Sequence, residues 1–238
     1  MLDERELYER QQSLGVNTAQ SVAIIGCGGI GSWIAMYLAL AGIENLDLYD
    51  GDKIEAHNLN RFPLGPSAVG KYKSEALAEA LIALRPGVMV IPRMNFEPQI
   101  HTLERYDWAI VSTDSLKSRR MVYQEVLKEH KDHGRSYLRY IEAGADGMQM
   151  TVSFSPAEFQ TDEEENPGYR SVPVFVGPCT LAASIVTYYV LMGAPNDDSF
   201  HATWSRSVTL VINKFSEADD HFDDVTDTRE VSDVQAEP

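Results

Sequence analysis

The chain has 238 residues, of which 44% are hydrophobic, and this length and composition predict one large globular domain. No run approaches about 18 apolar residues and the N-terminal residues are charged, which predicts a soluble, cytoplasmic protein without a membrane span. The formal net charge of −16 disfavours a nucleic-acid partner, because DNA or RNA would be repelled at long range.

The first predicted elements are a helix over residues 2–14 and a buried parallel strand over residues 22–25. Gly26, Gly28 and Gly31 follow this strand with the spacing G-x-G-x-x-G, ahead of a predicted helix that ends at Gly42. Such glycines let the backbone approach a phosphate, and the helix N-terminus presents free N–H groups to it. The glycines alone would also suit plain packing of a strand against a helix.

A second predicted strand, residues 46–49, leads to Asp50, about 20 residues past the glycine loop, where Rossmann-type sites carry an acid for ribose hydroxyls. Asp52, Asn58, Arg61 and Lys73 follow within the next stretch of chain. A dehydrogenase has no need of this concentration of polar and cationic groups, whereas a site that neutralises a triphosphate does. The pattern therefore favours ATP over NAD.

These motifs resemble those of the ThiF/MoeB/HesA family, the bacterial relatives of ubiquitin-activating enzymes. The family pattern G-x-G-G-x-G-S, D-x-D, N-L-x-R and G-x-x-K is matched by residues 26–32, 50–52, 58–61 and 70–73. The resemblance adds Gly29 to the nucleotide-binding glycines, and it is strong to about residue 120 and looser beyond. Phe62 and Ser115 depart from the family pattern, which has Gln and Asn there, but both changes leave the charged groups in place.

The resemblance also implies roles for residues outside the glycine loop. Arg10, in the opening pattern of an aromatic residue, Arg and Gln, matches an arginine that reaches the γ-phosphate of the partner's ATP in a homodimer. Asp114 matches the acid of a T-D-N motif, and we expect it to hold Mg²⁺ at the end of a parallel strand. A surface arginine and a helix N-cap are the respective alternatives.

The two cysteines, Cys27 and Cys179, cannot form the four-cysteine zinc site that many family members carry, so no zinc is expected. Cys179 precedes a predicted apolar helix over residues 181–192, and a thiol beside a helix N-terminus can have a lowered pKa. Some relatives use a cysteine near this region to form a thioester or persulfide. Cys179 is therefore a candidate catalytic residue, with a packed structural thiol as the alternative.

The other predicted elements complete an α/β fold. Helices are expected over residues 74–84, 98–105 and 115–131, strands over 88–91 and 108–111, a hairpin over 137–154 and a closing strand over 207–212. The fold class is a Rossmann-like, mostly parallel sheet with helices on both faces and an antiparallel C-terminal extension. The acidic segment 156–178 is either a mobile lid or a disordered insertion.

We predict a single adenylation domain over residues 1–215, with a nucleotide-binding half (21–120) and a sheet extension with a crossover region (135–215). Residues 216–238 form an acidic, disordered tail with nine acids and one arginine. The expected function is Mg²⁺- and ATP-dependent adenylation of the C-terminal carboxylate of a ubiquitin-like or sulfur-carrier protein. An ATP-dependent tRNA-modifying dehydratase of the same fold and an NAD-dependent oxidoreductase are the alternatives.

Overall fold

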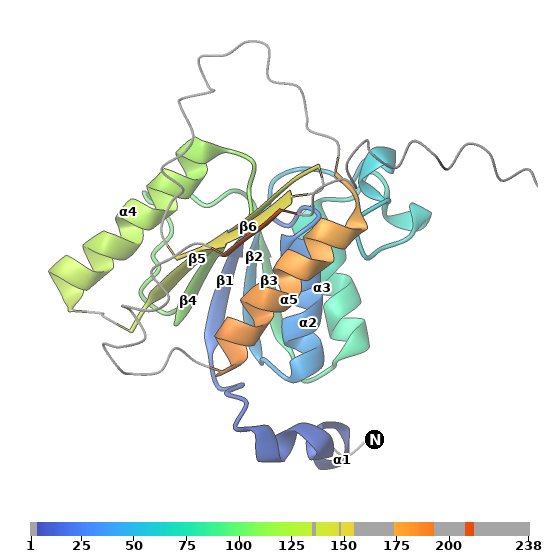
Figure 1. Ribbon diagram of the computed structural model, residues 1–238, viewed down its shortest axis with the longest axis horizontal. Coiled ribbons are helices and arrows are strands. Elements are labelled where there is room, and N and C mark those ends of the chain that lie inside the picture. The colour runs from blue at the N-terminus through green and yellow to red at the C-terminus, as the bar shows by residue number, and fades with distance from the viewer. Residues whose placement is uncertain (1–3, 135–136, 148, 155–173, 193–207, 212–238) are drawn as a thin grey trace, which may run out of the picture.

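A twisted seven-stranded sheet forms the centre of the computed structural model, which describes residues 4–134, 137–147, 149–154, 174–192 and 208–211 (Figure 1). The strand order is β3-β2-β1-β4-β5-β6-β7. The strands are β1 (Ser21–Ile25), β2 (Asn45–Tyr49), β3 (Met89–Arg93), β4 (Trp108–Val111), β5 (Arg139–Asp146), β6 (Gln149–Ser153) and β7 (Val208–Val211).

The first five strands run parallel and the last two extend the sheet with antiparallel pairing. The chain leaves β1 toward β2 and β3 on one side and later returns to place β4 and β5 on the other. The order therefore reverses between β1 and β4, the place where open α/β sheets form ligand-binding crevices. The predicted fold class, including the antiparallel extension, is confirmed.

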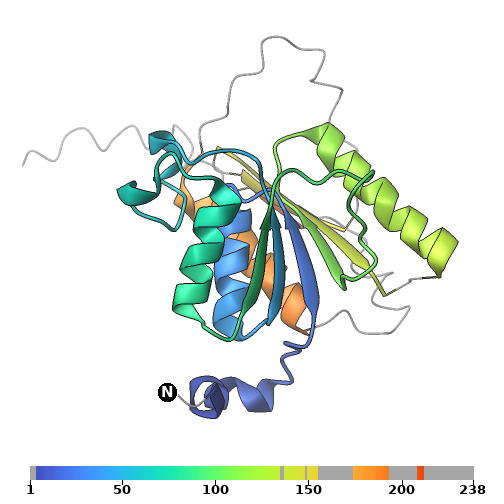
Figure 2. The ribbon, with the colours of Figure 1, turned by 180° about the vertical axis from the view of Figure 1, so that it is seen from behind.

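Helices cover both faces of this sheet, with α2, α3 and α5 on one face and α4 on the other (Figures 1 and 2). The α-helices are α1 (Glu4–Tyr8), α2 (Gly31–Ala41), α3 (Lys73–Leu84), α4 (Leu116–His133) and α5 (Val176–Met192). Three short 3₁₀ helices are η1 (Glu9–Leu14), η2 (Ala56–Asn58) and η3 (Pro66–Ala68). Within the described residues, none of these helices has the length and apolar character to cross a membrane.

The central strands are buried on both sides, which is why they are continuous apolar runs in the sequence. Val22 and Ile24 of β1 belong to the core cluster shared with α2, α3 and α5, whereas Ala23 and Ile25 belong to the cluster shared with α4. Alternate residues of one strand thus hold two helical layers in place. The carboxyl end of the sheet is left to be shaped by loops.

Three local predictions differ from the structure. Residues 98–105 form turns rather than a helix, because the Glu97 carbonyl closes only one turn and Leu103 then buries its side chain in the sheet-facing core. Helix α5 begins at Val176, five residues earlier than predicted. Strand β5 runs to Asp146, three residues past residue 143, where the first strand of the hairpin is predicted to end. The predicted tail and most of the 156–178 segment lie outside the described residues.

Candidate functional site

A cavity of about 210 Å³ opens at the carboxyl ends of β1, β2, β4 and β5. It therefore lies over the reversal of strand order, where the parallel strands deliver their following loops to one place. Its lining combines a glycine loop, both kinds of charge and small residues from β5. The lining residues are Gly26, Gly28, Gly29, Ile30, Asp50, Asp52, Asn58, Arg61, Phe62, Lys73, Ser112, Thr113, Asp114, Arg119, Ala143, Gly144, Ala145, Val174 and Cys179.

The glycines after β1 serve two different purposes. Gly26 has φ +95°, and a Cβ at this position would lie 2.6 Å from the Thr113 backbone nitrogen. A Cβ at Gly31 would lie only 1.9 Å from the Gly26 carbonyl oxygen, so the absence of a side chain lets α2 start directly against the loop. A Cβ at Gly28 would meet no described atom within 4 Å. Gly26 and Gly31 are thus needed for packing, while Gly28 leaves backbone open to the cavity.

Asp50 ties the glycine loop to the loop after β2. Its side chain accepts hydrogen bonds from the backbone N–H groups of Cys27 (2.8 Å) and Asp52 (2.9 Å). The residue is 8% exposed, and this burial raises the pKa of Asp50 while the nearby Lys73 partly opposes the rise. The carboxylate predicted to bind ribose is therefore also a structural anchor for the glycine loop.

Lys73 is the first residue of α3 and places its ammonium group over the acids of the β2 loop. The Nζ atom lies 2.8 Å from Asp52 Oδ2 and 4.0 Å from Asp50 Oδ1. The helix itself is fixed to the same loop, because the Ser74 hydroxyl donates to the Asp50 carbonyl at 2.9 Å. A phosphate entering the cavity would thus meet a cation whose present partners are carboxylates.

Asn58 and Arg61 reach the cavity from the segment around η2. The side-chain Oδ1 of Asn58 accepts from the Glu55 N–H at 3.0 Å, which leaves the side-chain NH₂ group as a donor toward a ligand. The Arg61 side chain lies across Gly29, where a Cβ would be 2.9 Å from the arginine Cδ atom. One guanidinium nitrogen donates to Asn60 Oδ1 at 2.9 Å. Both side chains therefore offer donors suited to phosphate oxygens.

Asp114 stands in the loop after β4, and its side chain is exposed. The N-cap of α4 is Ser115, whose hydroxyl accepts from the Ser118 N–H at 3.2 Å, so the alternative role of Asp114 as the helix cap is wrong. Among the residues that the structure describes, none pairs with the Asp114 carboxylate. A carboxylate of this kind lining the cavity would suit Mg²⁺, which takes one or two carboxylates together with phosphate and water oxygens.

No three acidic, histidine or cysteine side chains cluster into a metal site anywhere in the described part of the chain. Magnesium held at Asp114 would accordingly need ligands from a nucleotide and water as well as from protein.

Cys179 lies in the first turn of α5 with its sulfur against the glycine loop. A Cβ at Gly29 would be 3.0 Å from Cys179 Sγ, and the cysteine is 2% exposed. Burial raises the pKa of the Cys179 thiol, and the neighbouring Arg61 opposes this only in part. The pKa is thus raised and not lowered as a helix N-terminus would suggest, so the protonated thiol is favoured in this conformation.

Of the predicted site residues, Gly31 packs behind the glycine loop without lining the cavity, and Arg10 lies well away from it. Arg10 is exposed on η1. The segment that begins with α1 lies beyond the end of α2 that is remote from the glycine loop (Figure 1). Gln11 donates to the Ala41 carbonyl at 2.6 Å, which places η1 beside the last turn of α2. The 11 residues of α2 span about 16 Å. Arg10 therefore does not reach the cavity of its own chain.

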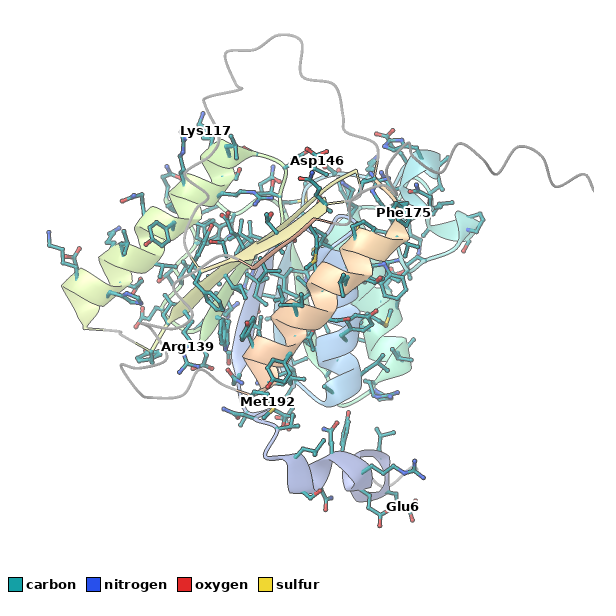
Figure 3. All side chains as sticks on the ribbon, in the orientation of Figure 1. Glu6, Lys117, Arg139, Asp146, Phe175 and Met192 are labelled. Atoms are coloured by element: carbon teal, nitrogen blue, oxygen red, sulfur yellow. The ribbon has the colours of Figure 1, made fainter. Side chains whose placement is uncertain are left out.

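The two ends of the molecule can be followed in Figure 3. Asp146 and Phe175 lie near the cavity end of β5 and α5, whereas Glu6 and Met192 lie toward the opposite end. The Asn17 N–H donates to the Leu191 carbonyl at 2.7 Å and ties the N-terminal segment to that remote end of α5.

Several lining residues had no role in the predicted site. They come from the glycine loop, the segment after η2, the β4 loop, α4, β5 and the residues before α5, and they are Ile30, Phe62, Ser112, Thr113, Arg119, Ala143, Gly144, Ala145 and Val174. Arg119 lies one turn after Asp114 in the sequence, and its charge was the available local signal. The small residues of β5 have no comparable signal in the local sequence, because they reach the cavity only through the pairing of β4 with β5.

Comparison with known proteins identifies related chains. Residues 8–182 match the ThiF family. The chain is 37% identical over 106 residues to adenylyltransferase and sulfurtransferase MOCS3 of Xenopus laevis, covering 43% of this chain and 24% of the relative. It is 39% identical over 155 residues to adenylyltransferase and sulfurtransferase uba4 of Aspergillus terreus, covering 63% and 31%. The chain thus spans about a quarter to a third of these relatives.

Solved structures share the fold. E. coli MccB with AMPCPP and MccA superposes with a TM-score of 0.60 at 22% identity, covering 79% of this chain and 58% of that one. PaaA gives a TM-score of 0.60 at 22% identity and covers 89% and 74%. At these identities the likeness establishes the architecture, and the chemistry has to be argued from the cavity.

Proposed function

The chain belongs to the ThiF family, and from this we propose that it uses ATP and Mg²⁺ to adenylate the C-terminal carboxylate of a small ubiquitin-like or sulfur-carrier protein. One observation carries the proposal. The loops after β1, β2 and β4 and the segment around η2 bring hydrogen-bond donors suited to phosphate oxygens, together with a free carboxylate, to one cavity. The curated relatives named adenylyltransferase and sulfurtransferase support the reaction class.

In the proposed reaction, a carboxylate oxygen of the carrier attacks the α-phosphorus of ATP. The bond between that phosphorus and the oxygen bridging to the β-phosphate breaks, and pyrophosphate leaves with the electron pair. The products are an acyl-adenylate and pyrophosphate. The reaction requires no protein nucleophile, so orientation and charge compensation are the contributions expected from the side chains.

The roles follow the order of the loops across the sheet. Asp50, beside Asp52, binds the ribose hydroxyls, and the glycine loop binds the phosphates. The side-chain NH₂ group of Asn58 donates hydrogen bonds to the phosphate oxygens. Arg61 and Lys73 neutralise charge that develops on the α- and β-phosphates. Lys73 has to exchange its ion pair with Asp52 for a phosphate oxygen. Magnesium held at Asp114 would supply further positive charge at the phosphates.

Arg10 has a place in this proposal only if a second subunit brings it to the cavity. Because Arg10 lies beyond the remote end of α2, it cannot contact a nucleotide in the cavity of its own chain. In a homodimer it could contact the γ-phosphate of the ATP bound by the partner subunit. Cys179 is not required for adenylation. A later transfer to a sulfur atom would need this thiol to become exposed and ionised.

Two alternative functions fit the site less well. A tRNA-modifying dehydratase would also adenylate a carboxylate, but the net charge of −16 opposes tRNA binding. An NAD-dependent oxidoreductase would need the glycine loop and Asp50 and would leave Arg61, Lys73 and Asp114 without a function.

The test has a nucleotide arm and a carrier arm. ATP with MgCl₂ should raise the melting temperature, while NAD should not, since a ligand that binds only the folded state stabilises it. Purified ubiquitin-fold proteins ending in Gly-Gly should then support exchange of labelled pyrophosphate into ATP, and truncation of the Gly-Gly should stop it. Stabilisation by NAD alone would exclude the proposal, as would exchange that depends on tRNA.

A further inference from the structure

Arg119 joins the loop after β4 to strand β5, two parts of the cavity wall that are far apart in the sequence. It lies near the start of α4, and its side chain is 14% exposed. Its Nε–H donates to the Thr113 carbonyl at 2.8 Å, and another guanidinium nitrogen donates to the Ala143 carbonyl at 3.2 Å. The first carbonyl belongs to the β4 loop and the second to β5. A single side chain therefore fixes the spacing between these two walls of the cavity.

The Arg119 guanidinium is itself held by an ion pair with Glu142. The closest ion-pair distance is 3.6 Å, and the Glu142 side chain is 4% exposed. The Tyr140 hydroxyl donates to the other Glu142 oxygen at 2.6 Å, so the carboxylate cannot swing freely. A planar guanidinium can donate in divergent directions from Nε and from its terminal nitrogens, whereas a lysine offers one ammonium centre. The geometry is therefore specific for arginine.

The loop that Arg119 grips carries Asp114. Its first residue is anchored on the other side, because the Ser112 hydroxyl donates to the Gly26 carbonyl at 2.7 Å. Asp114 follows directly after the carbonyl that Arg119 holds, and its own carboxylate has no partner among the described residues. The direction of the Asp114 side chain is accordingly set through its backbone.

We propose that Arg119 is a positioning residue that locks the β4 loop to β5 and so fixes the position of the Asp114 carboxylate, which would hold Mg²⁺. The inference rests on the proposed function, because it concerns ATP and Mg²⁺ in the same cavity. Arg119 acts through Asp114 and through the Ala143 wall. It is therefore separate from Arg61 and Lys73, which meet the phosphates directly.

The decisive measurement is the Mg²⁺ dependence of ATP binding by Arg119→Lys, followed as the shift in melting temperature with ATP. Groups that hold a metal ligand in place typically change metal affinity by about 10-fold to 100-fold when mutated. We expect Arg119→Lys to need about 10-fold more Mg²⁺ or more, while ATP binding measured with EDTA stays at the wild-type level. In exchange assays, kcat should fall and KM for ATP should change little.

Two comparisons separate positioning from general stability. Arg120→Lys makes the same chemical change at the next, exposed position and should retain the wild-type Mg²⁺ dependence. In an Asp114→Asn background, Arg119→Lys should add no further Mg²⁺ effect, since two residues acting through one carboxylate are not additive. Glu142→Gln keeps the side-chain shape and should show a smaller effect than Arg119→Lys.

Each possible outcome decides the matter. A wild-type Mg²⁺ dependence in Arg119→Lys overturns the proposal, and so does an equal effect in the Asp114→Asn background. Loss of folding, or of metal-free ATP binding along with the metal effect, would show that Arg119 serves stability, which also overturns it. If the wild-type protein is not stabilised by ATP at all, the proposed function itself fails, and that result is distinct from the others.

Discussion

Lys73 and Asp52 form an ion pair with 2.8 Å between Nζ and Oδ2, in which the lysine side chain is 13% exposed and the aspartate side chain 77% exposed. Pairs with a well-solvated member contribute about 1 kcal/mol or less. A phosphate oxygen can therefore replace Asp52 at little energetic cost. In the proposed reaction, the ion pair with Asp52 would hold the Lys73 ammonium group at the cavity until ATP binds.

Asp50 should make stability depend on pH. Burial raises its pKa above the ordinary value of 3.8, so the folded chain binds this proton more tightly than the unfolded chain. Its contribution to stability is full below the unfolded pKa and is lost as pH rises through the folded pKa. Urea unfolding of wild type and Asp50→Asn from about pH 3 to about pH 7 should show wild type losing stability relative to the variant. A constant difference would contradict the shift.

Gly31 and Gly28 should respond differently to alanine. A Cβ at residue 31 would collide with the Gly26 carbonyl, and overpacking of this kind costs about 1–3 kcal/mol. Gly28→Ala meets open space and should change stability by less than about 0.5 kcal/mol. Urea unfolding without nucleotide measures both. Equal losses in the two variants would mean that the loop packs differently.

Asp114 and Ser115 should separate function from helix capping. Ser115→Ala removes the N-cap acceptor and should cost about 1 kcal/mol of stability. Asp114→Asn should leave unfolding within about 0.5 kcal/mol of wild type yet abolish carrier-dependent pyrophosphate exchange. If Asp114→Asn kept full exchange at low Mg²⁺, the metal role of Asp114 would be wrong.

Arg10 should act across a dimer. Arg10→Ala is expected to lower the exchange rate by about 10³-fold if its cation is a main clamp on the γ-phosphate. Mixing Arg10→Ala with Asp114→Asn subunits creates one intact site per mixed dimer, hence about a quarter of wild-type activity after random exchange. Arg120→Ala serves as the control for loss of a surface charge. No recovery after verified subunit exchange, or a monomeric active protein, would rule out the trans arrangement.

Cys179 should be a poor nucleophile in the native protein. Burial raises the pKa of Cys179 and also that of Cys27, so native alkylation by iodoacetamide at about pH 8 should be at least about 10-fold slower than in urea. Cys179→Ser should retain pyrophosphate exchange, because adenylation needs no thiolate. Rapid native alkylation assigned to Cys179 by mass spectrometry would instead support a covalent role.

Local sequence was sufficient for the central strands and the glycine loop, whose signals lie within a short stretch of chain. The apolar run before Gly26 predicted strand β1, and the acid Asp50 was correctly predicted to follow strand β2. Both predictions depend only on residues that are neighbours in the sequence. The helix predicted over residues 98–105 was wrong, because burial of the Leu103 side chain against the sheet outweighs helical propensity. The pKa of Cys179 could not be read from its place at a helix start, since burial dominates.

Sequence alone thus determined the mostly parallel sheet, the glycine loop and the types of side chain available for a triphosphate. Only the tertiary structure decided that Arg119 meets the Ala143 carbonyl, that Ser115 rather than Asp114 caps α4, and that Arg10 lies beyond the far end of α2. The physical reason is that hydrogen bonds and burial between segments depend on strand order and register. Local propensity and motif spacing do not specify which strands pair with each other.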